Sequence, residues 1–226
     1  CVADHTNHTN VRLIDLDVDT SAYEQGHIAG AVGWNWQSQL QQSLRRDLIS
    51  KEEMEQLLGG SSIDNNTTVV LYGDNNNWFA CWAFWQMKYY GHNDVRIMNG
   101  GRAKWEAEGR PLSITPANVS AKSYHASNSN ESIRAYRDQV LASVNAGNVA
   151  LVDVRSPDEY SGTLLAPPNL PQEGSQRGGH IPGAASIPWG QAVNEDGTFK
   201  SADDLLTLYG GKGIDCLLYT SPSPRD

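Results

Sequence analysis

Short apolar runs and longer mixed stretches alternate along the first half of the chain. Residues 11–18 and 67–72 are apolar and rich in β-branched side chains, which predicts two buried strands. Residues 31–36 and 95–98 predict two further short strands. Because helical segments separate these runs, the pattern predicts a parallel sheet that is covered on both faces.

The segments between the apolar runs carry helix signals. Ser50 and Glu53 form a Ser-x-x-Glu capping box, which predicts a helix that ends at the Gly59-Gly60 pair. Further helices are predicted over residues 78–90, 101–108 and 134–144. Residues 112–132 are polar and rich in Ser and Asn, which is typical of a linker.

The chain contains an internal repeat. Two motifs occur twice in the same order: VRLIDLD at residues 11–17 matches VALVDVR at 149–155, and GHIAGA at 26–31 matches GHIPGA at 179–184. A helical stretch follows in each copy and ends at Asp64 and Asp215. The second copy has the longer loop, with 27 residues from Asp153 to His180 against 12 from Asp15 to His27. The repeat predicts two related domains.

The end of the chain differs in character from the rest. The sequence CLLYTSPSPRD at residues 216–226 resembles a translated adaptor of a sequencing library. The first copy continues for about 50 residues after Asp64, whereas only this tail follows Asp215. We therefore expect a native sequence that is cut at Asp215. The expected domains are residues 1–113, a linker over 114–132, an incomplete second domain over 133–215 and a non-native tail over 216–226.

Composition narrows the classes of function. A chain of 226 residues is long enough for two domains. Its net charge of −9 argues against a nucleic-acid partner, and its apolar runs are too short to predict a membrane span. The three cysteines, Cys1, Cys81 and Cys216, have neither disulfide nor metal-site spacing. We expect a cytoplasmic protein without a metal or cofactor.

The repeated motifs resemble those of the tandem rhodanese family of sulfurtransferases. The family signature is an aromatic residue, three further residues, and then His-aliphatic-Pro-Gly-Ala. Residues 23–31 (YEQGHIAGA) match it except that Ala29 replaces Pro, whereas residues 180–184 are intact but Gln176 stands at the aromatic position. Two stretches are similar to bacterial thiosulfate sulfurtransferases in particular, DVRSPDEYSG at 153–162 and LYGDNNNWFA at 71–80.

This resemblance implies an α/β fold of two rhodanese-like, doubly wound parallel-sheet domains. It implies that a Cys thiolate in a loop at a helix N-terminus takes sulfur from thiosulfate as a persulfide and passes it to cyanide or a thiol. The first domain of tandem members usually has Asp in place of Cys, and Asp74 matches that position. The resemblance places the catalytic Cys beyond Asp215, so no residue of this chain is assigned as catalytic.

The resemblance also suggests four substrate contacts, namely Trp78, Phe79, Arg155 and Arg177. Trp78 and Phe79 match an aromatic pair that borders the active-site cleft of the family, and the alternative is ordinary helix core. Arg155 and Arg177 flank the long loop of the second copy and suit an anionic sulfur donor. The alternatives are a salt bridge from Arg155 to Asp158 or Glu159, and simple solvent exposure of Arg177.

Other chemically versatile residues are expected to be structural. Cys81 lies in an apolar helix, where a buried thiol is inert. His27 and His180 precede Gly-containing turns in both copies and are expected to hold backbone groups. Asp15 and Asp153 end their strands and are expected to fix the adjacent loops.

The predicted function is a two-domain thiosulfate sulfurtransferase. The alternatives are a 3-mercaptopyruvate sulfurtransferase, a non-catalytic rhodanese module used for binding, and a rhodanese-fold phosphatase or arsenate reductase. The residues that follow Asp215 in the gene would distinguish them, because the alternatives differ in the loop that carries the Cys.

Overall fold

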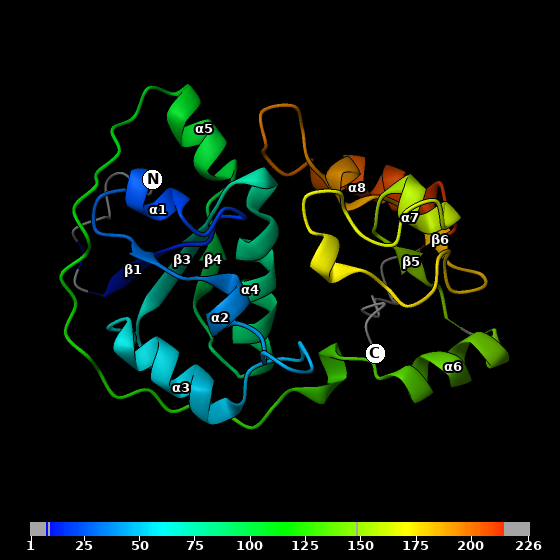
Figure 1. The fold of residues 1–226 in the computed structure, drawn as a ribbon, viewed down its shortest axis with the longest axis horizontal. Helices are drawn as coiled ribbons and strands as arrows, with labels where there is room; N and C mark the ends of the chain where they lie inside the picture. Colours follow the sequence, from blue (N-terminus) through cyan, green and yellow to red (C-terminus); the bar gives the residue numbers. More distant parts are fainter. Residues whose placement is uncertain (1–7, 9, 148, 215–226) are drawn as a thin grey trace. The chain divides into compact units, whose positions relative to one another are not determined.

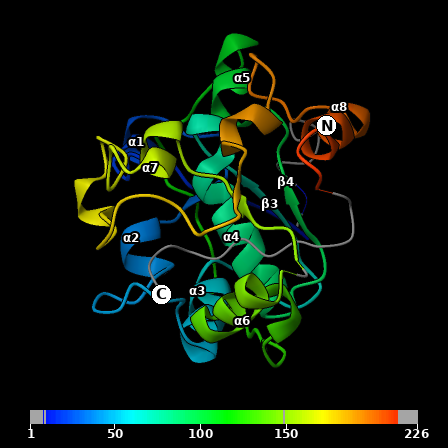
Figure 2. The same ribbon diagram turned by 90° about the vertical axis from the view of Figure 1, so that its right-hand side faces the viewer.

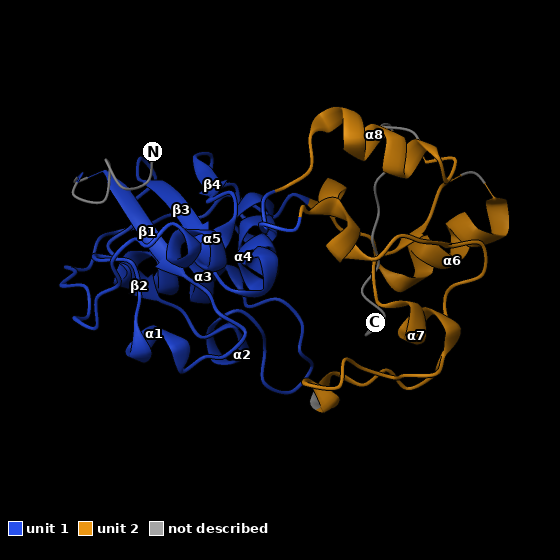
Figure 3. Cartoon of the chain, turned by 90° about the horizontal axis from the view of Figure 1, so that it is seen from above, with its two compact units in different colours: residues 1–130, 195–198 blue, residues 131–194, 199–226 orange. Residues whose placement is uncertain are grey.

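The computed structural model describes residues 8, 10–147 and 149–214. The chain divides into two compact units (Figure 3). Unit 1 comprises residues 1–130 and 195–198, and unit 2 comprises residues 131–194 and 199–226. Cys1 and the proposed non-native tail, including Cys216, lie outside the described residues.

Unit 1 is built on a four-stranded parallel sheet (Figure 1). The strands lie in the order β2-β1-β3-β4 and are β1 Val11–Asp15, β2 Val32–Gly33, β3 Thr68–Tyr72 and β4 Val95–Ile97. β1 pairs with β3 along its whole length, from Val11 opposite Thr68 to Asp15 opposite Tyr72. The predicted parallel sheet is confirmed, and the carboxyl ends of its strands meet at one edge.

Helices cover the sheet of unit 1. They are α1 Ala22–Gln25, α2 Trp36–Gln39, α3 Lys51–Gly60, α4 Trp78–Tyr89 and α5 Gly101–Ala107. Figure 2 shows α4 alongside β3 and β4, against which it packs. The opposite pleat of the sheet presents Leu13 and Tyr72, which pack with Trp105 of α5.

One predicted strand is shorter than expected for a local reason, and one predicted helix ends where its glycines indicate. The strand predicted over residues 31–36 is limited to β2, because Asn35 accepts hydrogen bonds from the backbone of Gln37 and Ser38 and thereby starts α2. The capping box of Ser50 and Glu53 is confirmed, and α3 ends at Gly60, within the predicted Gly pair.

Much of the expected linker packs along unit 1, and we call residues 113–130 the strap. Ser113 exchanges both backbone hydrogen bonds with His27. Farther along, Lys122 N–H donates to the carbonyl of Gly59, and buried Tyr124 contacts His92 through its hydroxyl at 3.1 Å. Polar composition predicts a linker, but these backbone bonds make the strap part of unit 1.

The described part of unit 2 is smaller. Its parallel strands are β5 Val152–Asp153 and β6 Ala185–Ser186, and its helices are α6 Arg137–Ala146, α7 Pro157–Ser161 and α8 Ala202–Gly210. The core centres on Val140 of α6 packed with Leu151 and Ala184. α8 buries none of its own residues. In the part of the chain that the structure describes, no helix has the length and apolarity needed to cross a bilayer.

Candidate functional site

The loop after β3 in unit 1 is the position at which the family resemblance places a nucleophile. Asp74 begins it, and a short 3-10 turn, η2 Asn75–Asn77, leads into α4. All three Asn residues have left-handed backbones, with φ of 42°, 57° and 64°, a conformation that Asn tolerates better than most residues. The side chain of Asn77 accepts from Gly73 N–H at 3.0 Å and donates to the carbonyl of Met98 at 2.9 Å, which holds the loop in place.

Asp74 is held from both sides in this loop. Its carboxylate accepts from Val18 N–H at 2.6 Å, and its own N–H donates to Asp17 Oδ1 at 2.8 Å. Partial burial, followed by the charge of Asp17, raises the pKa of the Asp74 carboxyl. A carboxylate cannot form a persulfide, so the described contacts of Asp74 fit a structural role.

Behind Asp74 lies a buried ion cluster that sequence reasoning missed. The guanidinium of Arg102 donates to Asp15 Oδ2 at 2.8 Å and to Asp17 Oδ1 at 3.0 Å, and Tyr72 O–H donates to Asp15 Oδ2 at 2.6 Å. Burial and the charge of Asp17 outweigh Arg102 and raise the pKa of Asp15 to about 7. No sequence spacing could have found this pair, because Arg102 lies 87 residues from Asp15.

His27 has the structural role that its position predicts. It is fully buried, and its ring stacks on Tyr23 with centroids 3.8 Å apart. Nδ1 lies 2.8 Å from the carbonyl oxygen of Tyr23, and Nε2 lies 3.0 Å from that of Thr115 in the strap. Both ring nitrogens therefore face backbone carbonyl groups.

Unit 2 repeats this stack of an aromatic ring on the signature His. The aromatic residue is not at position 176, where the spacing of the signature places it. His180 stacks on Tyr160 at 3.6 Å, and its Nδ1 lies 2.8 Å from the carbonyl oxygen of Tyr160. Tyr160 O–H donates to the carbonyl of Ala184, the counterpart of the bond from Tyr23 to Ala31. Tyr160 is thus the aromatic of the second signature.

Gln176 is not that aromatic position, because it belongs to a loop inserted between Tyr160 and His180. We call residues 162–178 the inserted loop. Its ends touch: a Cβ on Gly162 would lie 2.8 Å from Gly179 N, and one on Gly178 would lie 2.9 Å from the carbonyl oxygen of Gly162. Insertion at this point leaves the stacked Tyr–His pair intact.

The two candidate arginines of unit 2 differ in their surroundings. Arg155 donates to Asp153 Oδ2 at 2.6 Å and to the carbonyl of Gly179 at 2.7 Å, so its carboxylate partner is neither Asp158 nor Glu159. Arg177 lies in the inserted loop and is exposed. Its side chain makes no hydrogen bond or ion pair with any other described residue.

The two candidate aromatics of unit 1 also differ from each other. Phe79 is buried and stacks on Trp36 with ring centroids 3.9 Å apart. Trp78 is half-buried, begins α4 directly after the Asp74 loop, and stacks on Phe79 at 5.3 Å. Trp78 is therefore the more accessible of the pair.

Cys81 is the free thiol of the described residues. Cys81 is half-buried rather than fully buried as expected, and this partial burial raises its pKa to about 11, which leaves little thiolate at neutral pH. Among the described residues, no three His, Cys, Asp or Glu side chains are grouped closely enough to hold a metal ion.

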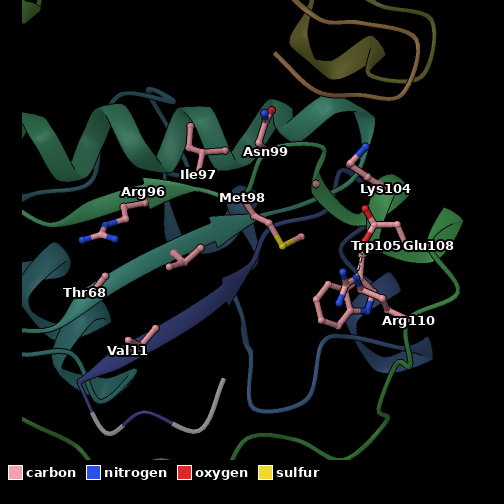
Figure 4. A pocket seen from close by; sticks show the side chains of 12 residues that line it. Val11, Thr68, Arg96, Ile97, Met98, Asn99, Lys104, Trp105, Glu108 and Arg110 are labelled. Carbon is pink, nitrogen blue, oxygen red and sulfur yellow. Dashed lines mark hydrogen bonds and ion pairs between the residues drawn. The ribbon is translucent and has the colours of Figure 1, made fainter. Parts of the chain in front are cut away.

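A cavity of about 590 Å³ lies elsewhere in unit 1, between the sheet and α5 (Figure 4). Val11 and Thr68 line it from the strands, and Trp105 and Arg110 line it from the α5 side. None of the four candidate contacts borders it. Its arginines are already paired, with Arg110 2.6 Å from Glu108.

In unit 2 a helix packs on the corresponding face of the sheet. Leu151, the counterpart of Leu13, contacts Val140 of α6 there. The cavity of unit 1 lies on the same face of its sheet as Leu13. No residue of the Asp74 loop lines it.

Comparison with known proteins agrees with the repeated geometry. The model of the rhodanese-like domain matches residues 1–108 and 136–222. A protein of Mycobacterium bovis named "Putative thiosulfate sulfurtransferase 1" is 52% identical over 205 residues, which cover 91% of this chain and 73% of that protein. A protein of Haloferax volcanii named "Putative thiosulfate sulfurtransferase" is 53% identical over 204 residues, covering 90% and 71%.

Solved structures share the fold. SseA from Escherichia coli, described as a 3-mercaptopyruvate sulfotransferase, has a TM-score of 0.81 at 22% identity, covering 95% of this chain and 82% of that one. The resemblance inferred from the motifs is confirmed by the family match in two regions. Since that match spans most of the chain and the relatives exceed half identity over nine-tenths of it, this chain belongs to the rhodanese-like family.

Proposed function

We propose that this chain derives from a two-domain thiosulfate sulfurtransferase whose first domain is structural and whose second domain carries the reacting Cys. The observation that carries the proposal is the repeated Tyr–His stack, combined with Asp74 in the loop where a nucleophile would stand. The names of the relatives at 52% and 53% identity support the same activity.

The proposed reaction needs no external oxidant or reductant. A Cys thiolate attacks the sulfane sulfur of thiosulfate, the S–S bond of thiosulfate breaks, and sulfite leaves with the bonding electrons. The Cys then carries a persulfide. Cyanide or a thiol attacks the terminal sulfur, and the Cys leaves as thiolate. With cyanide the product is thiocyanate.

The repeat supports a position for this Cys. Asp74 lies 10 residues after Asp64, and Asp64 corresponds to Asp215. We place the nucleophile of the parent protein about ten residues beyond Asp215, in the sequence that the repeat predicts there. The backbone N–H groups of such a loop and the following helix N-terminus would favour the thiolate.

Substrate contacts are proposed from the accessible candidates. Arg177 is the preferred contact for a sulfur-donor anion, because it is exposed and unpaired among the described residues. Trp78 supplies an apolar contact beside the Asp74 loop, with Phe79 as its packing support. Arg155 supports donor binding by holding the base of the inserted loop rather than by touching the donor, since Asp153 and Gly179 occupy its guanidinium.

The test compares this chain with the same chain carrying its genomic continuation after Asp215. Thiocyanate formation from thiosulfate and cyanide is expected from the completed protein and not from this chain. Cys81→Ser is the matched control and should leave the completed protein unchanged. Turnover by this chain that disappears on Cys81→Ser would contradict the proposal.

A second donor distinguishes the alternatives. Activity with 3-mercaptopyruvate that exceeds activity with thiosulfate would favour the mercaptopyruvate enzyme, and a genomic continuation without Cys would favour a binding module. The cytoplasmic location expected from the small number of cysteines remains a prediction, and cell fractionation tests it.

A further inference from the structure

A guanidinium joins two backbone features in unit 1. Arg102, near the start of α5, bonds through Nη2 to Asp15 at the end of β1 and through Nη1 to the carbonyl of Gly26 at 2.5 Å. Gly26 directly precedes the stacked His27. The guanidinium therefore ties the end of the first strand to the turn that contains the signature His.

A guanidinium fills the same position in unit 2. Arg155 bonds through Nη2 to Asp153 at the end of β5 and to the carbonyl of Gly179, which directly precedes His180. Asp153 and Gly179 are the repeat counterparts of Asp15 and Gly26. The two units thus make the same bridge between carboxylate and carbonyl.

The two guanidinium groups come from different places in the chain. Arg102 reaches the bridge from a helix that lies 87 residues after Asp15, whereas Arg155 lies two residues after Asp153. The repeat counterpart of Arg155 in unit 1 is Asp17, so the charge at this position is reversed. Asp17 pairs with the distant Arg102 instead.

We propose that Arg155 is a positioning residue that replaces the Arg102 guanidinium in the second repeat and thereby fixes the inserted loop. The second half of this inference, that the fixed loop presents Arg177 to a sulfur-donor anion, rests on the proposed function. The first half rests on the two bridges alone.

Burial and geometry explain why the bridge fixes the loop. The side chains of Arg155 and Asp153 are only 16% and 10% exposed. Removal of the guanidinium leaves a nearly buried carboxylate and the Gly179 carbonyl without this donor. Gly179 has φ of 98° and adjoins the closed base of the inserted loop. Loss of the hydrogen bond from Arg155 to its carbonyl therefore makes the base of the loop more mobile. Nε and Nη2 of Arg155 also bond the two carboxylate oxygens of Asp153, at 3.0 and 2.6 Å, and Lys cannot reproduce this two-nitrogen fork while it holds the Gly179 carbonyl.

The first experiment moves the guanidinium within unit 1. We compare Asp17→Arg/Arg102→Ala with the matched control Asp17→Ala/Arg102→Ala, since both lose the Asp17 carboxylate equally. Urea unfolding is followed by Trp fluorescence, because Trp189 is the one Trp outside unit 1. The Arg variant should have the higher midpoint, by about 0.5 M urea. An equal or lower midpoint would overturn the equivalence of the two bridges.

The second experiment measures amide hydrogen exchange in unit 2. It tests the positioning role of Arg155 even if neither double variant of unit 1 folds. Ser175 N–H, bonded to the Leu165 carbonyl at 2.9 Å, reports on the inserted loop. Arg155→Gln should accelerate the exchange of this amide about tenfold, and Arg155→Lys should restore little of the wild-type protection. Arg137→Gln is the control, since that side chain is 75% exposed and should change nothing. Unchanged exchange in Arg155→Gln would overturn the positioning role.

The third experiment uses the completed protein. Arg155→Gln should raise KM for thiosulfate several-fold with kcat nearly unchanged, because the loop is displaced while the reacting Cys is not. A fall in kcat at unchanged KM would overturn the link between Arg155 and donor binding. An inactive parental protein would refute the proposed function and would leave the first two results standing.

Discussion

At the scale of single residues, buried charge in unit 1 is concentrated where the strands end. One guanidinium, that of Arg102, serves the carboxylates of Asp15 and Asp17, and the side chains of both carboxylates are at most 2% exposed. Two carboxylates that share one cation in a buried site cannot both ionise freely. The cluster therefore makes the stability of unit 1 depend on pH near neutrality.

Asp15→Asn tests this dependence. The pKa of Asp15 is about 7 in the folded chain and near 4 when unfolded, so folding takes up a proton between these values. The stability from protonated Asp15 is complete below pH 4 and is lost as pH rises through 7. Between pH 6 and 8 the wild type should lose stability relative to Asp15→Asn, by on the order of 1 kcal/mol. Urea unfolding of both proteins at both pH values measures this difference. Parallel pH profiles of the wild type and Asp15→Asn would contradict the prediction.

Cys81 is predicted to react slowly. A pKa of about 11 leaves roughly one thiolate in a thousand at pH 8, against about one in four for an ordinary Cys. In a Cys1→Ser/Cys216→Ser background, alkylation by iodoacetamide should be about a hundredfold slower than that of a free thiol. Unfolding in urea should abolish the difference. A native rate near that of glutathione would disprove the assignment of Cys81 as inert.

At the scale of elements, α3 and the strap depend on one close approach. The carbonyl of Lys122 in the strap would lie 2.6 Å from a Cβ at Gly59, whereas a Cβ at Gly60 would meet nothing within 4 Å. A side chain is therefore sterically excluded at Gly59 but not at Gly60. Gly59 admits the strap, and Gly60 is a helix residue without a contact to lose.

Substitution of the two glycines should have opposite effects. Gly59→Ala forces the strap away from α3 and should lower the free energy of unfolding by about 1–3 kcal/mol. Gly60→Ala should raise it by up to about 1 kcal/mol, because Ala loses less backbone entropy in a helix. Urea unfolding followed by Trp fluorescence gives both values. Equal effects at the two positions would show that the strap does not restrict Gly59.

At the scale of the whole molecule, the two units should differ in resistance to proteolysis. Unit 1 has a four-stranded sheet with fully buried side chains such as Ile14 and Leu71, whereas the described part of unit 2 pairs two strands of two residues each. Small sheets with little buried apolar surface open more readily.

Limited digestion should therefore leave a resistant fragment near residues 1–130, with the strap retained, and should degrade residues 131–214 first. Mass spectrometry of the time course identifies the fragment. Digestion in urea serves as the control, because both halves should then disappear together. Equal lifetimes of the two halves under native conditions would contradict the predicted asymmetry.

Several features could be determined from the sequence because their causes lie within a few residues. The apolar runs at β1 and β3, the Ser50–Glu53 capping box and the duplicated Gly-His-Ile motif each depend on local spacing. Together they were sufficient to predict a parallel α/β fold and a tandem repeat. The assignment of Asp74 as the counterpart of a nucleophile rests on the family resemblance and remains a prediction.

Tertiary structure alone decided which partners these residues have. Arg102 meets Asp15 across 87 residues, Tyr160 reaches His180 across an inserted loop, and a polar strap closes over α3. No periodic pattern in the sequence signals these contacts, because each depends on where the parallel strands and their crossover helices bring distant side chains. Local propensity thus specified the elements, and packing of those elements selected the guanidinium that Asp15 receives, whereas Asp153 receives its guanidinium from two residues farther along the chain.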